Sequence, residues 1–411
     1  MSKVVWYITK YFAAPSENSM GGRGWLLLRE FAKKGHKPVV ITSDSNNLVE
    51  MPSLLRSVTM QECDGVRLVW LKTLKYSVAK SSLRVLSWFH FEWNLFFLDK
   101  HGLPKPDVVI VSSLSLLTIL NGVFLKKKYK CKLVFEIRDI WPLTIVEEGG
   151  FSPRNPFVMF LGVIERWGYK RSDLIVGTMP NLGEHVHQVL GYPKPVGCIP
   201  MGVEPSMLTA TQRVSQKYIE QYVNPGYFNV VHAGTVGITN ALDTFFKAAE
   251  VLRDISKIRF VIVGDGALKE AYQEKYGYLP NIVFAPKVEK KLVQSVLACA
   301  DVVYFSVFKS KVWDYGQSLN KVIDYMLSAK PVLASYSGFP SMIDEAGCGY
   351  FVPAEDVDSL VMKIKELAIM SETDRGVIGA KGRNWLLENR VYEKLADDYL
   401  DLLFPQQELK Y

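Results

Sequence analysis

Cysteine is scarce in this sequence, and histidine offers little in its place. The 411 residues include five cysteines, an odd number, and none of them falls in a C-x-x-C pattern. This usage argues against a disulfide framework or a zinc knuckle and is typical of a reducing compartment. Among the six histidines, His185 and His187 are two positions apart and would lie on different sides of a helix. We therefore expect neither a metal site nor a cofactor.

Long hydrophobic runs are also nearly absent. Only five consecutive apolar residues precede Lys10, far short of a signal-peptide core, which favours a cytoplasmic location. The eighteen uncharged residues between Asp107 and Lys126, VVIVSSLSLLTILNGVFL, are long enough for a membrane span. Ser112 and Ser113 in this segment are typical of a break with a helix cap, so we prefer a strand followed by an amphipathic helix.

Negative charge is under-represented in the first half of the chain. The net charge is +7, but residues 1–205 hold 26 Lys and Arg against 17 Asp and Glu, hence +9, and the remainder carries −2. The imbalance predicts that the first half faces an anionic surface or substrate. Nucleic acid is not an expected partner, because the sequence has no zinc finger, aromatic RNA-binding signature or basic helix.

The hydrophobic pattern predicts two α/β domains. Both halves alternate short β-branched runs with helical segments, which is typical of parallel sheets covered on both faces. We expect doubly wound, Rossmann-like domains at 1–203 and 204–390, a hinge at 202–226, and a last helix in 391–411 that crosses back to the first domain. Strands are expected at 4–8, 39–42, 66–71, 108–111, 133–137, 174–178, 229–233, 259–263, 282–284, 302–305, 331–335 and 350–352.

Glycine-containing loops follow several of these strands. Ligands of open parallel sheets bind at the carboxyl ends of the strands, and glycine lets a backbone approach a phosphate closely. Gly21 and Gly22 follow the first strand, Gly234 follows the strand at 229–233, and Gly264 follows the strand at 259–263. An ordinary tight turn explains Gly21 and Gly22 equally well, since they form no G-x-G-x-x-G fingerprint.

The segment EIRDIWP places three charged residues at the end of an apolar strand. Glu136, Arg138 and Asp139 are costly to bury together without a function, which favours a site. The alternative is an ion pair of Arg138 with one of the two acids.

The segment YGQSLNKVIDYMLSAKPVLAS contains a polar loop that leads into a helix. The first amides of a helix have no intrahelical partner and face the positive end of the macrodipole, so this start is a candidate anion site. The positive charge of Lys321 is unfavourable at the positive end of the helix dipole, and it becomes favourable if an anion binds there. Asp324 lies one turn later, and its alternative role is that of a solvated carboxylate.

The aromatic segment SWFHFEWNLFFL, residues 87–98, has rings on every side of a predicted helix. It is either a core helix or an interfacial helix. In the second case the basic segment KKKYKCK, residues 126–132, would supply charge for anionic lipid.

Taken in order, these segments resemble the retaining nucleotide-sugar glycosyltransferases of the GT-B fold, in particular the large family 4 group that builds bacterial surface polysaccharides. FEIRDIWP is similar to the acceptor-side motif of a subgroup like the L-fucosamine (N-acetyl) transferases. The resemblance covers nearly the whole chain. Its other segments are GGRGWLLLREFAKKGHKPVVIT, VGTMPNLGEHV, IPMGVEP, AGTVGITNALD, VGDGALKEAY, ACADVVYFSV, SLNKVIDYMLSAKPVLAS and EAGCGYFVP.

The resemblance implies that a nucleotide sugar binds in a cleft between two facing Rossmann-like domains. Asp324 matches the second acid of the family's Glu-x7-Glu motif, which holds the ribose hydroxyls, and Gly316 stands at the first acid. The family's Arg and Lys for the pyrophosphate are replaced by Thr235 and Asn240. The subgroup's Ser-Pro-Asn-Lys loop is matched, with Leu in place of Pro, by Ser318, Leu319, Asn320 and Lys321.

Residue roles follow from this resemblance. Lys321 is the expected replacement cation, with Arg23 and Arg138 as helpers, and Asp139 positions or deprotonates the acceptor. The expected catalytic residues are Asp139, Lys321 and Arg138. The expected donor-binding residues are Gly21, Gly22, Arg23, Gly234, Thr235, Asn240, Gly264, Lys287, Ser318, Leu319, Asn320, Lys321 and Asp324.

The implied reaction is metal-independent, retaining transfer of a hexose, expected to be an N-acetylated deoxyhexose, from a UDP-sugar to a polyprenyl-diphosphate-linked glycan in O-antigen or capsule synthesis. The expected location is peripheral, on the inner face of the plasma membrane. Two alternatives remain: an NDP-sugar epimerase of the same fold, and a non-catalytic scaffold that binds nucleotide sugars.

Overall fold

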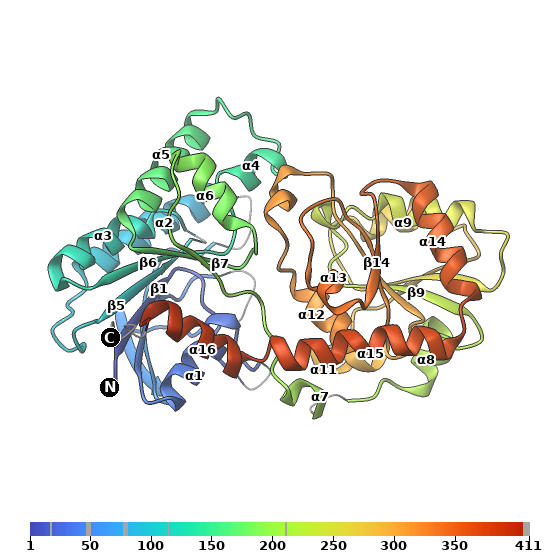
Figure 1. Cartoon of the computed structure of the whole chain (residues 1–411), viewed down its shortest axis with the longest axis horizontal. Coiled ribbons are helices and arrows are strands. Elements are labelled where there is room, and N and C mark those ends of the chain that lie inside the picture. Colours follow the sequence, from blue (N-terminus) through green and yellow to red (C-terminus); the bar gives the residue numbers. More distant parts are fainter. Residues whose placement is uncertain (17–18, 47–50, 77–80, 114, 210–211, 406–411) are drawn as a thin grey trace, which may run out of the picture. The chain divides into compact units, whose positions relative to one another are not determined.

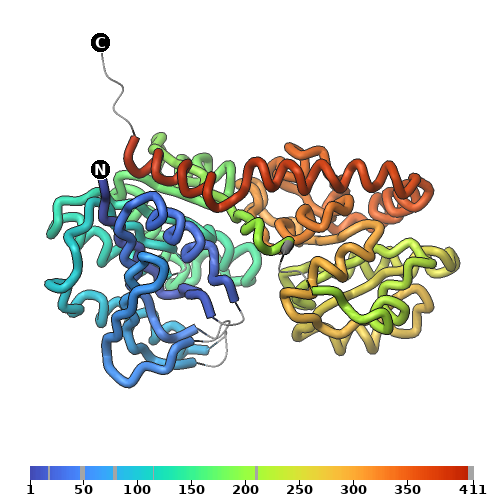
Figure 2. Tube along the Cα trace, turned by 90° about the horizontal axis from the view of Figure 1, so that it is seen from below, coloured from blue at the N-terminus to red at the C-terminus, as the bar shows by residue number. Residues whose placement is uncertain are grey.

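The chain folds into two compact units (Figures 1 and 2). The computed structural model describes residues 1–16, 19–46, 51–76, 81–113, 115–209 and 212–405. Unit 1 comprises Met1–Pro200 together with the C-terminal segment from Tyr392, and unit 2 comprises Met201–Val391. Each unit is an α/β domain built on a largely parallel sheet, which confirms the predicted fold class.

Unit 1 contains an eight-stranded sheet in the order β3-β4-β2-β1-β5-β6-β7-β8. Only β3 runs antiparallel to its neighbour. β3 and β8 were not predicted, because β3 has exposed polar residues at its centre and β8 is only three residues long. The strands are β1 (Val4–Thr9), β2 (Lys37–Ser43), β3 (Val58–Cys63), β4 (Val66–Leu71), β5 (Val108–Ser112), β6 (Lys132–Ile137), β7 (Leu174–Gly177) and β8 (Val196–Cys198).

Helices cover both faces of this sheet. α1 and the last helix, α16, pack together on one face, and α2, α3 and α5 lie on the other (Figure 1). The described part of the uncharged segment after Asp107 contains β5 and the first part of α3. None of the described helices is long and apolar enough to span a membrane. The helices are α1 (Arg23–Lys33), α2 (Ser82–Phe97), α3 (Thr118–Tyr129), α4 (Leu143–Glu147), α5 (Pro156–Arg171), α6 (Leu182–Leu190) and α16 (Tyr392–Leu403).

Unit 2 contains a six-stranded, fully parallel sheet in the order β11-β10-β9-β12-β13-β14. All six strands were predicted, because they are continuous apolar runs that helices bury on both faces. They are β9 (Phe228–Ala233), β10 (Ile258–Val263), β11 (Ile282–Ala285), β12 (Val302–Ser306), β13 (Val332–Ser335) and β14 (Gly349–Val352).

The segment 202–226, which was predicted as the hinge, belongs to unit 2. Its Val203, Val214 and Val223 are buried in the unit 2 core. The helices of unit 2 are α7 (Ser206–Thr209), α8 (Gln216–Tyr222), α9 (Asp243–Val251), α10 (Lys269–Tyr276), α11 (Lys290–Leu297), α12 (Asn320–Leu327), α13 (Met342–Ala346), α14 (Val357–Ile369) and α15 (Glu372–Asn389), with short 3-10 turns at Ile238–Asn240 and Lys311–Tyr315.

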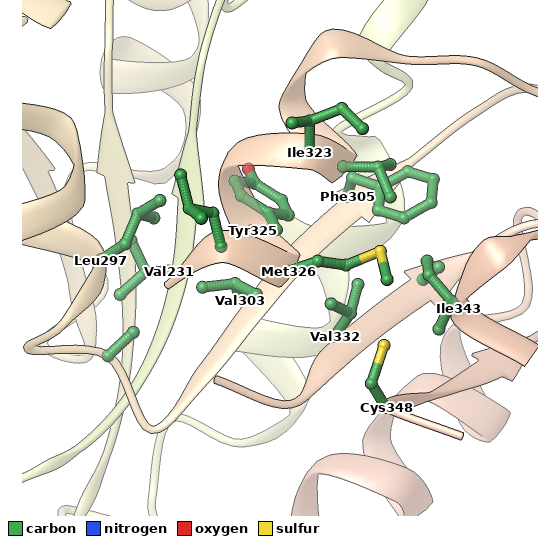
Figure 3. Packing of buried hydrophobic residues seen from close by; sticks show 14 of the residues in the cluster. Val231, Leu297, Val303, Phe305, Ile323, Tyr325, Met326, Val332, Ile343 and Cys348 are labelled. Atoms are coloured by element: carbon green, nitrogen blue, oxygen red, sulfur yellow. The ribbon is translucent and has the colours of Figure 1, made fainter. Parts of the chain in front are cut away.

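Helix α12 is anchored in the core by its apolar face. Tyr325 and Met326 are fully buried and pack near the valines of β9, β12 and β13 (Figure 3). The Tyr325 hydroxyl also donates to the Ala233 carbonyl at 3.0 Å and accepts from the Ala233 N–H at 2.9 Å. These contacts hold α12 against the end of β9, next to the site described below.

Candidate functional site

A pocket of about 510 Å³ opens in unit 2 at the carboxyl ends of β9 and β10. It combines two glycine turns, the start of α12 and part of α11. Three lysines and two aspartates give the lining a positive balance. The lining residues are Ala233, Gly234, Thr235, Val263, Gly264, Asp265, Lys287, Val288, Lys290, Val293, Val296, Leu319, Asn320, Lys321 and Asp324.

The two glycine turns are packed against each other too closely for side chains. Gly234 and Gly264 have φ angles of 156° and 158°. A Cβ on Gly264 would lie 1.8 Å from the Gly234 carbonyl oxygen, which is a severe clash between backbone segments. Only glycine fits at position 264, and the missing Cβ lets a ligand approach the backbone of this turn closely.

The start of α12 forms the opposite part of the pocket. Its N-cap residue, Leu319, has no side chain that caps the helix, so the first amides are not satisfied by a side-chain cap. Lys321 lies in the first turn and Asp324 one turn later, as predicted from their spacing. An uncapped helix start beside a lysine suits an anion.

Lys321 is held by Asn240. Its ammonium donates to the Asn240 side-chain oxygen, and the Asn240 amide in turn donates to the Thr235 carbonyl at 2.8 Å. Burial lowers the pKa of Lys321 to about 8. Asn240 itself does not line the pocket, so the structure gives it a positioning role in place of the predicted donor contact.

Asp324 is paired with a lysine that the sequence analysis missed. The Lys290 ammonium lies 2.6 Å and 2.5 Å from the two carboxylate oxygens, and the Asp324 side chain is only 14% exposed. Lys290 begins α11, directly beyond the carboxyl end of β11. Ligands of parallel sheets bind beyond the carboxyl ends of the strands, and this rule points to Lys290 once it is applied to β11 as well as to β9 and β10.

Most of the other predicted donor-binding residues of unit 2 line the pocket, and one does not. Thr235, Lys287, Leu319 and Asn320 line the pocket. Ser318 does not; its hydroxyl accepts from the Met201 N–H at 2.9 Å.

The predicted glycine turn of unit 1 is present. Gly21 has a φ of 87°, and a Cβ at this position would lie 2.5 Å from the Trp25 ring. The Gly22 N–H donates to the Ala13 carbonyl at 2.9 Å, and Gly22 precedes α1. The turn brings the chain back from β1 into α1.

Arg23 does not face a ligand, contrary to the prediction. It forms an ion pair with Glu136 at 3.0 Å in which both side chains are fully buried. It also donates to the carbonyls of Ile199 and Pro200. Burial disfavours the charge of Glu136, but the facing guanidinium outweighs it and holds the pKa of Glu136 below its usual value. Arg23 and Glu136 are therefore structural residues.

Asp139 lies beyond the carboxyl end of β6 with its carboxylate oriented by neighbours. It accepts from the Trp141 indole at 2.8 Å and from the Thr144 hydroxyl at 2.6 Å. The adjacent Arg138 is half-buried, and its backbone N–H donates to the Ser113 hydroxyl at 3.1 Å. Burial, with a contribution from Asp139, raises the pKa of Glu148 to about 7.

A second group at this edge of unit 1 escaped the sequence analysis. Tyr11, which follows β1, accepts from the Trp88 indole at 2.8 Å and from Arg84 at 3.2 Å. The Lys10 ammonium lies 4.5 Å from the Tyr11 ring centre, and burial, followed by repulsion from Arg84, lowers the pKa of Lys10 to about 7. The Trp88 and Trp141 rings are 5.4 Å apart, which links this group to Asp139. No short motif signals it, because its members come from separate loops and α2.

Comparisons with known proteins agree with this architecture. The family model described as Glycosyltransferase Family 4 matches residues 25–207, and the model described as Glycosyl transferases group 1 matches residues 228–369. The two matches fall on unit 1 and unit 2 in turn. A comparison with curated protein sequences found no match.

Solved structures show the same fold at low sequence identity. Sucrose-phosphate synthase from Thermosynechococcus elongatus is 14% identical with a TM-score of 0.71, over 97% of this chain and 98% of that chain. An α,α-trehalose-phosphate synthase (UDP-forming) from Burkholderia vietnamiensis is 13% identical with a TM-score of 0.72, over 98% and 97%. Anabaena HepE in complex with UDP and glucose is 12% identical with a TM-score of 0.62, over 98% and 99%. None of the three is a fucosamine transferase, so the finer subgroup assignment gains no support from them.

Proposed function

This chain is a glycosyltransferase of the GT-B fold, with a family 4 domain followed by a group 1 domain, and we propose that it transfers a hexose from a nucleotide sugar bound in the unit 2 pocket. The observation that carries the proposal is the convergence of Lys321, the uncapped start of α12 and the bare turn at Gly264 on one pocket. Together they suit a diphosphate.

Lys321 compensates for the missing family cation in this proposal. The family's lysine position is occupied by Asn240, and the Lys321 ammonium contacts the Asn240 side chain. A positive charge therefore lies beside the position where the family lysine begins. This contact supports the assignment of Lys321 to the donor's diphosphate.

Asp324 holds the ribose hydroxyls of the donor in this proposal. A carboxylate offers about four acceptor sites, so it is able to accept from a ribose while it keeps its contact with Lys290. Uridine is the proposed base, supported by the UDP in the similar structure of Anabaena HepE.

The transfer step needs few side chains. In retaining transfer the bond from C1 to the leaving phosphate breaks while the acceptor oxygen bonds to C1 on the same face. The leaving phosphate takes the acceptor's proton, and Asp139 orients the acceptor hydroxyl. Stabilisation of the departing diphosphate then dominates, and losing one well-aimed donor typically costs about 2.7–4 kcal/mol of barrier.

We further propose a polyprenyl-diphosphate-linked glycan as the acceptor and an N-acetylated deoxyhexose as the sugar, in O-antigen or capsule synthesis. Similarity to the acceptor-side motif around Asp139 supports this choice. A sugar phosphate is the second candidate, favoured by the similarity to two sugar-phosphate synthases. Both acceptors are phosphorylated, which suits the cation Arg84 beside Tyr11 at this edge of unit 1.

The test is thermal stabilisation of the purified chain by UDP, GDP, ADP and TDP. Ligand at about a hundred times its dissociation constant adds about 2.7 kcal/mol of stability. We expect UDP to raise Tm and Asp324→Ala to abolish most of the effect. Donor hydrolysis and transfer assays with lipid-linked and sugar-phosphate acceptors then identify the acceptor class. No response to any of the nucleotides, or an equal response in Asp324→Ala, would contradict the proposed site.

A further inference from the structure

Helix α2 exposes an apolar face to solvent. Six of its large apolar side chains are between 47% and 65% exposed: Leu83, Leu86, Phe89, Trp93, Phe96 and Phe97. They recur at helical spacing along one side, while Trp88, Phe91 and Leu95 bury the other side. The interpretation as a simple core helix is therefore wrong, because only two of the six Phe and Trp rings of α2, those of Trp88 and Phe91, lie in the core.

The charged residues of α2 do not interrupt this face. All residues of α2 are described, and none of its exposed residues is charged. Arg84 donates to the Tyr11 hydroxyl, and Glu92 accepts from Thr118 at 2.6 Å and from Asn121 at 2.7 Å, both on α3. The helix thus directs its charges toward the protein and four of its six Phe and Trp rings toward solvent.

The apolar face continues onto the neighbouring helices. The Phe96 ring on α2 lies 5.0 Å from the Phe124 ring on α3. α3 also exposes Leu120. The neighbouring helix α5 contacts α3 (Figure 1) and exposes Met159, Phe160 and Val163. We call these residues of α2, α3 and α5 the apolar face.

The distribution of exposed rings sets this surface apart from the rest of the chain. Among the described residues, eight Phe and Trp side chains are exposed, and seven of them lie on α2, α3, α5 or the loop before α5. In unit 2 the exposed large apolar residues, such as Met362 and Val377, are scattered singly. A concentration of exposed rings on neighbouring helices is typical of an interaction surface.

Cations accompany the apolar face. Lys127 and Lys128 are exposed in the last turn of α3, next to Phe124, and Lys170 and Arg171 are exposed in the last turn of α5. Aromatic side chains next to positively charged residues are suited to the surface of an anionic membrane. There the rings enter the headgroup region and the cations bind lipid phosphates. In a two-fold dimer through the same face, these cations would meet like charges.

We propose that the apolar face docks unit 1 onto a membrane surface that contains anionic lipid. The chain then binds as a peripheral protein, with the rings providing apolar burial and the lysines providing electrostatic attraction. Two weak signals of this kind are needed for stable attachment without a spanning helix. The inference goes beyond the proposed reaction, because vesicle binding requires neither donor nor acceptor.

The experiment is flotation of the full chain with vesicles of phosphatidylcholine alone or mixed with phosphatidylglycerol. We expect at least roughly tenfold stronger partitioning onto the mixed vesicles, and a weaker effect at high salt. Trp93→Ser with Phe97→Ser, and separately Lys127→Glu with Lys128→Glu, should each lower binding by roughly tenfold or more. Met362→Ser with Ile369→Ser on unit 2 is the matched control and should leave binding unchanged.

Absence of binding to mixed vesicles would overturn the proposal, as would equal binding to both vesicle types. Light scattering without vesicles tests whether a second copy of the chain covers the apolar face instead. A dimer that becomes monomeric in the variant Trp93→Ser with Phe97→Ser would assign the face to a second copy and overturn the proposal. All four substituted residues of α2 and α3 are exposed, so circular dichroism should show an unchanged fold.

Discussion

The buried amine of Lys321 should make the affinity of the pocket for the donor depend on pH. Its pKa is lowered to about 8 because burial disfavours the ammonium. A bound diphosphate favours the ammonium, so above that pH the bound state takes up a proton that the free state has lost. Donor affinity should therefore be constant below about pH 7 and fall above about pH 8, by at most tenfold per pH unit.

The measurement is the Kd of a UDP-sugar by calorimetry between about pH 6.5 and pH 9, a range in which a diesterified diphosphate does not titrate. Lys321→Arg keeps its charge throughout and should bind with no such slope. The same slope in Lys321→Arg would assign the titration to another group.

The two aspartates should separate donor binding from transfer. Asp324→Asn removes a charged acceptor from the pocket and should raise the Kd for the donor roughly tenfold or more. Asp139→Asn lies in unit 1 and should leave this Kd unchanged while lowering kcat by roughly 10²-fold, because the acceptor hydroxyl is no longer held in place. Asp254→Asn is the control, since the Asp254 side chain is 90% exposed. Reversed effects of the two variants would contradict both role assignments.

At the scale of elements, the paired turns of β9 and β10 depend on glycine. Gly264→Ala would force the turn away from the Gly234 carbonyl and should cost more than about 2 kcal/mol while abolishing nucleotide binding. Gly376 is the matched control, because it is exposed within α15 and its substituted Cβ would meet nothing within 4 Å. Gly376→Ala should stabilise the chain by about 0.5–1 kcal/mol. Urea unfolding with and without UDP measures both.

The buried pair of Arg23 and Glu136 joins α1 to β6. Tyr7 donates to Glu136 at 2.7 Å and Tyr399 donates at 3.2 Å, so α16 takes part in the same network. Glu136→Ala leaves a buried guanidinium without its partner and should destabilise unit 1 by about 3–5 kcal/mol. Chemical denaturation monitored on a unit 1 tryptophan measures this loss. An unchanged transition would show that the network contributes nothing.

At the scale of the whole molecule, the C-terminal helix completes the unit formed by the N-terminal half. α16 lies against α1 (Figure 2). It buries Leu395, Tyr399 and Leu403 in the core of that unit, and the Lys132 ammonium donates to the carbonyls of Leu402 and Leu403. A chain that stops after Val391 should lose the folded unit 1 but keep nucleotide binding, because every pocket residue lies in unit 2. Limited proteolysis with and without UDP tests this. Protease resistance of unit 1 in the shortened chain would contradict it.

The amino-acid sequence by itself determined the fold class and the position of most strands. Continuous apolar runs bounded by glycine and polar residues specify buried parallel strands locally. The same local logic located the start of α12, with Lys321 and Asp324 one turn apart. β3 escaped because the Met-Gln-Glu at its centre is exposed on an edge strand, so it shows no buried alternation.

Only the tertiary structure decided which charged residues face a ligand. Arg23 meets Glu136 across 113 positions of sequence, Lys321 meets Asn240 across 81, and Lys290 meets Asp324 across 34. No local pattern reports such partners, because the pairing follows from strand order and helix packing. For the same reason, the packing of α2 against α3 and the sheet decides which of its rings are buried and which are exposed.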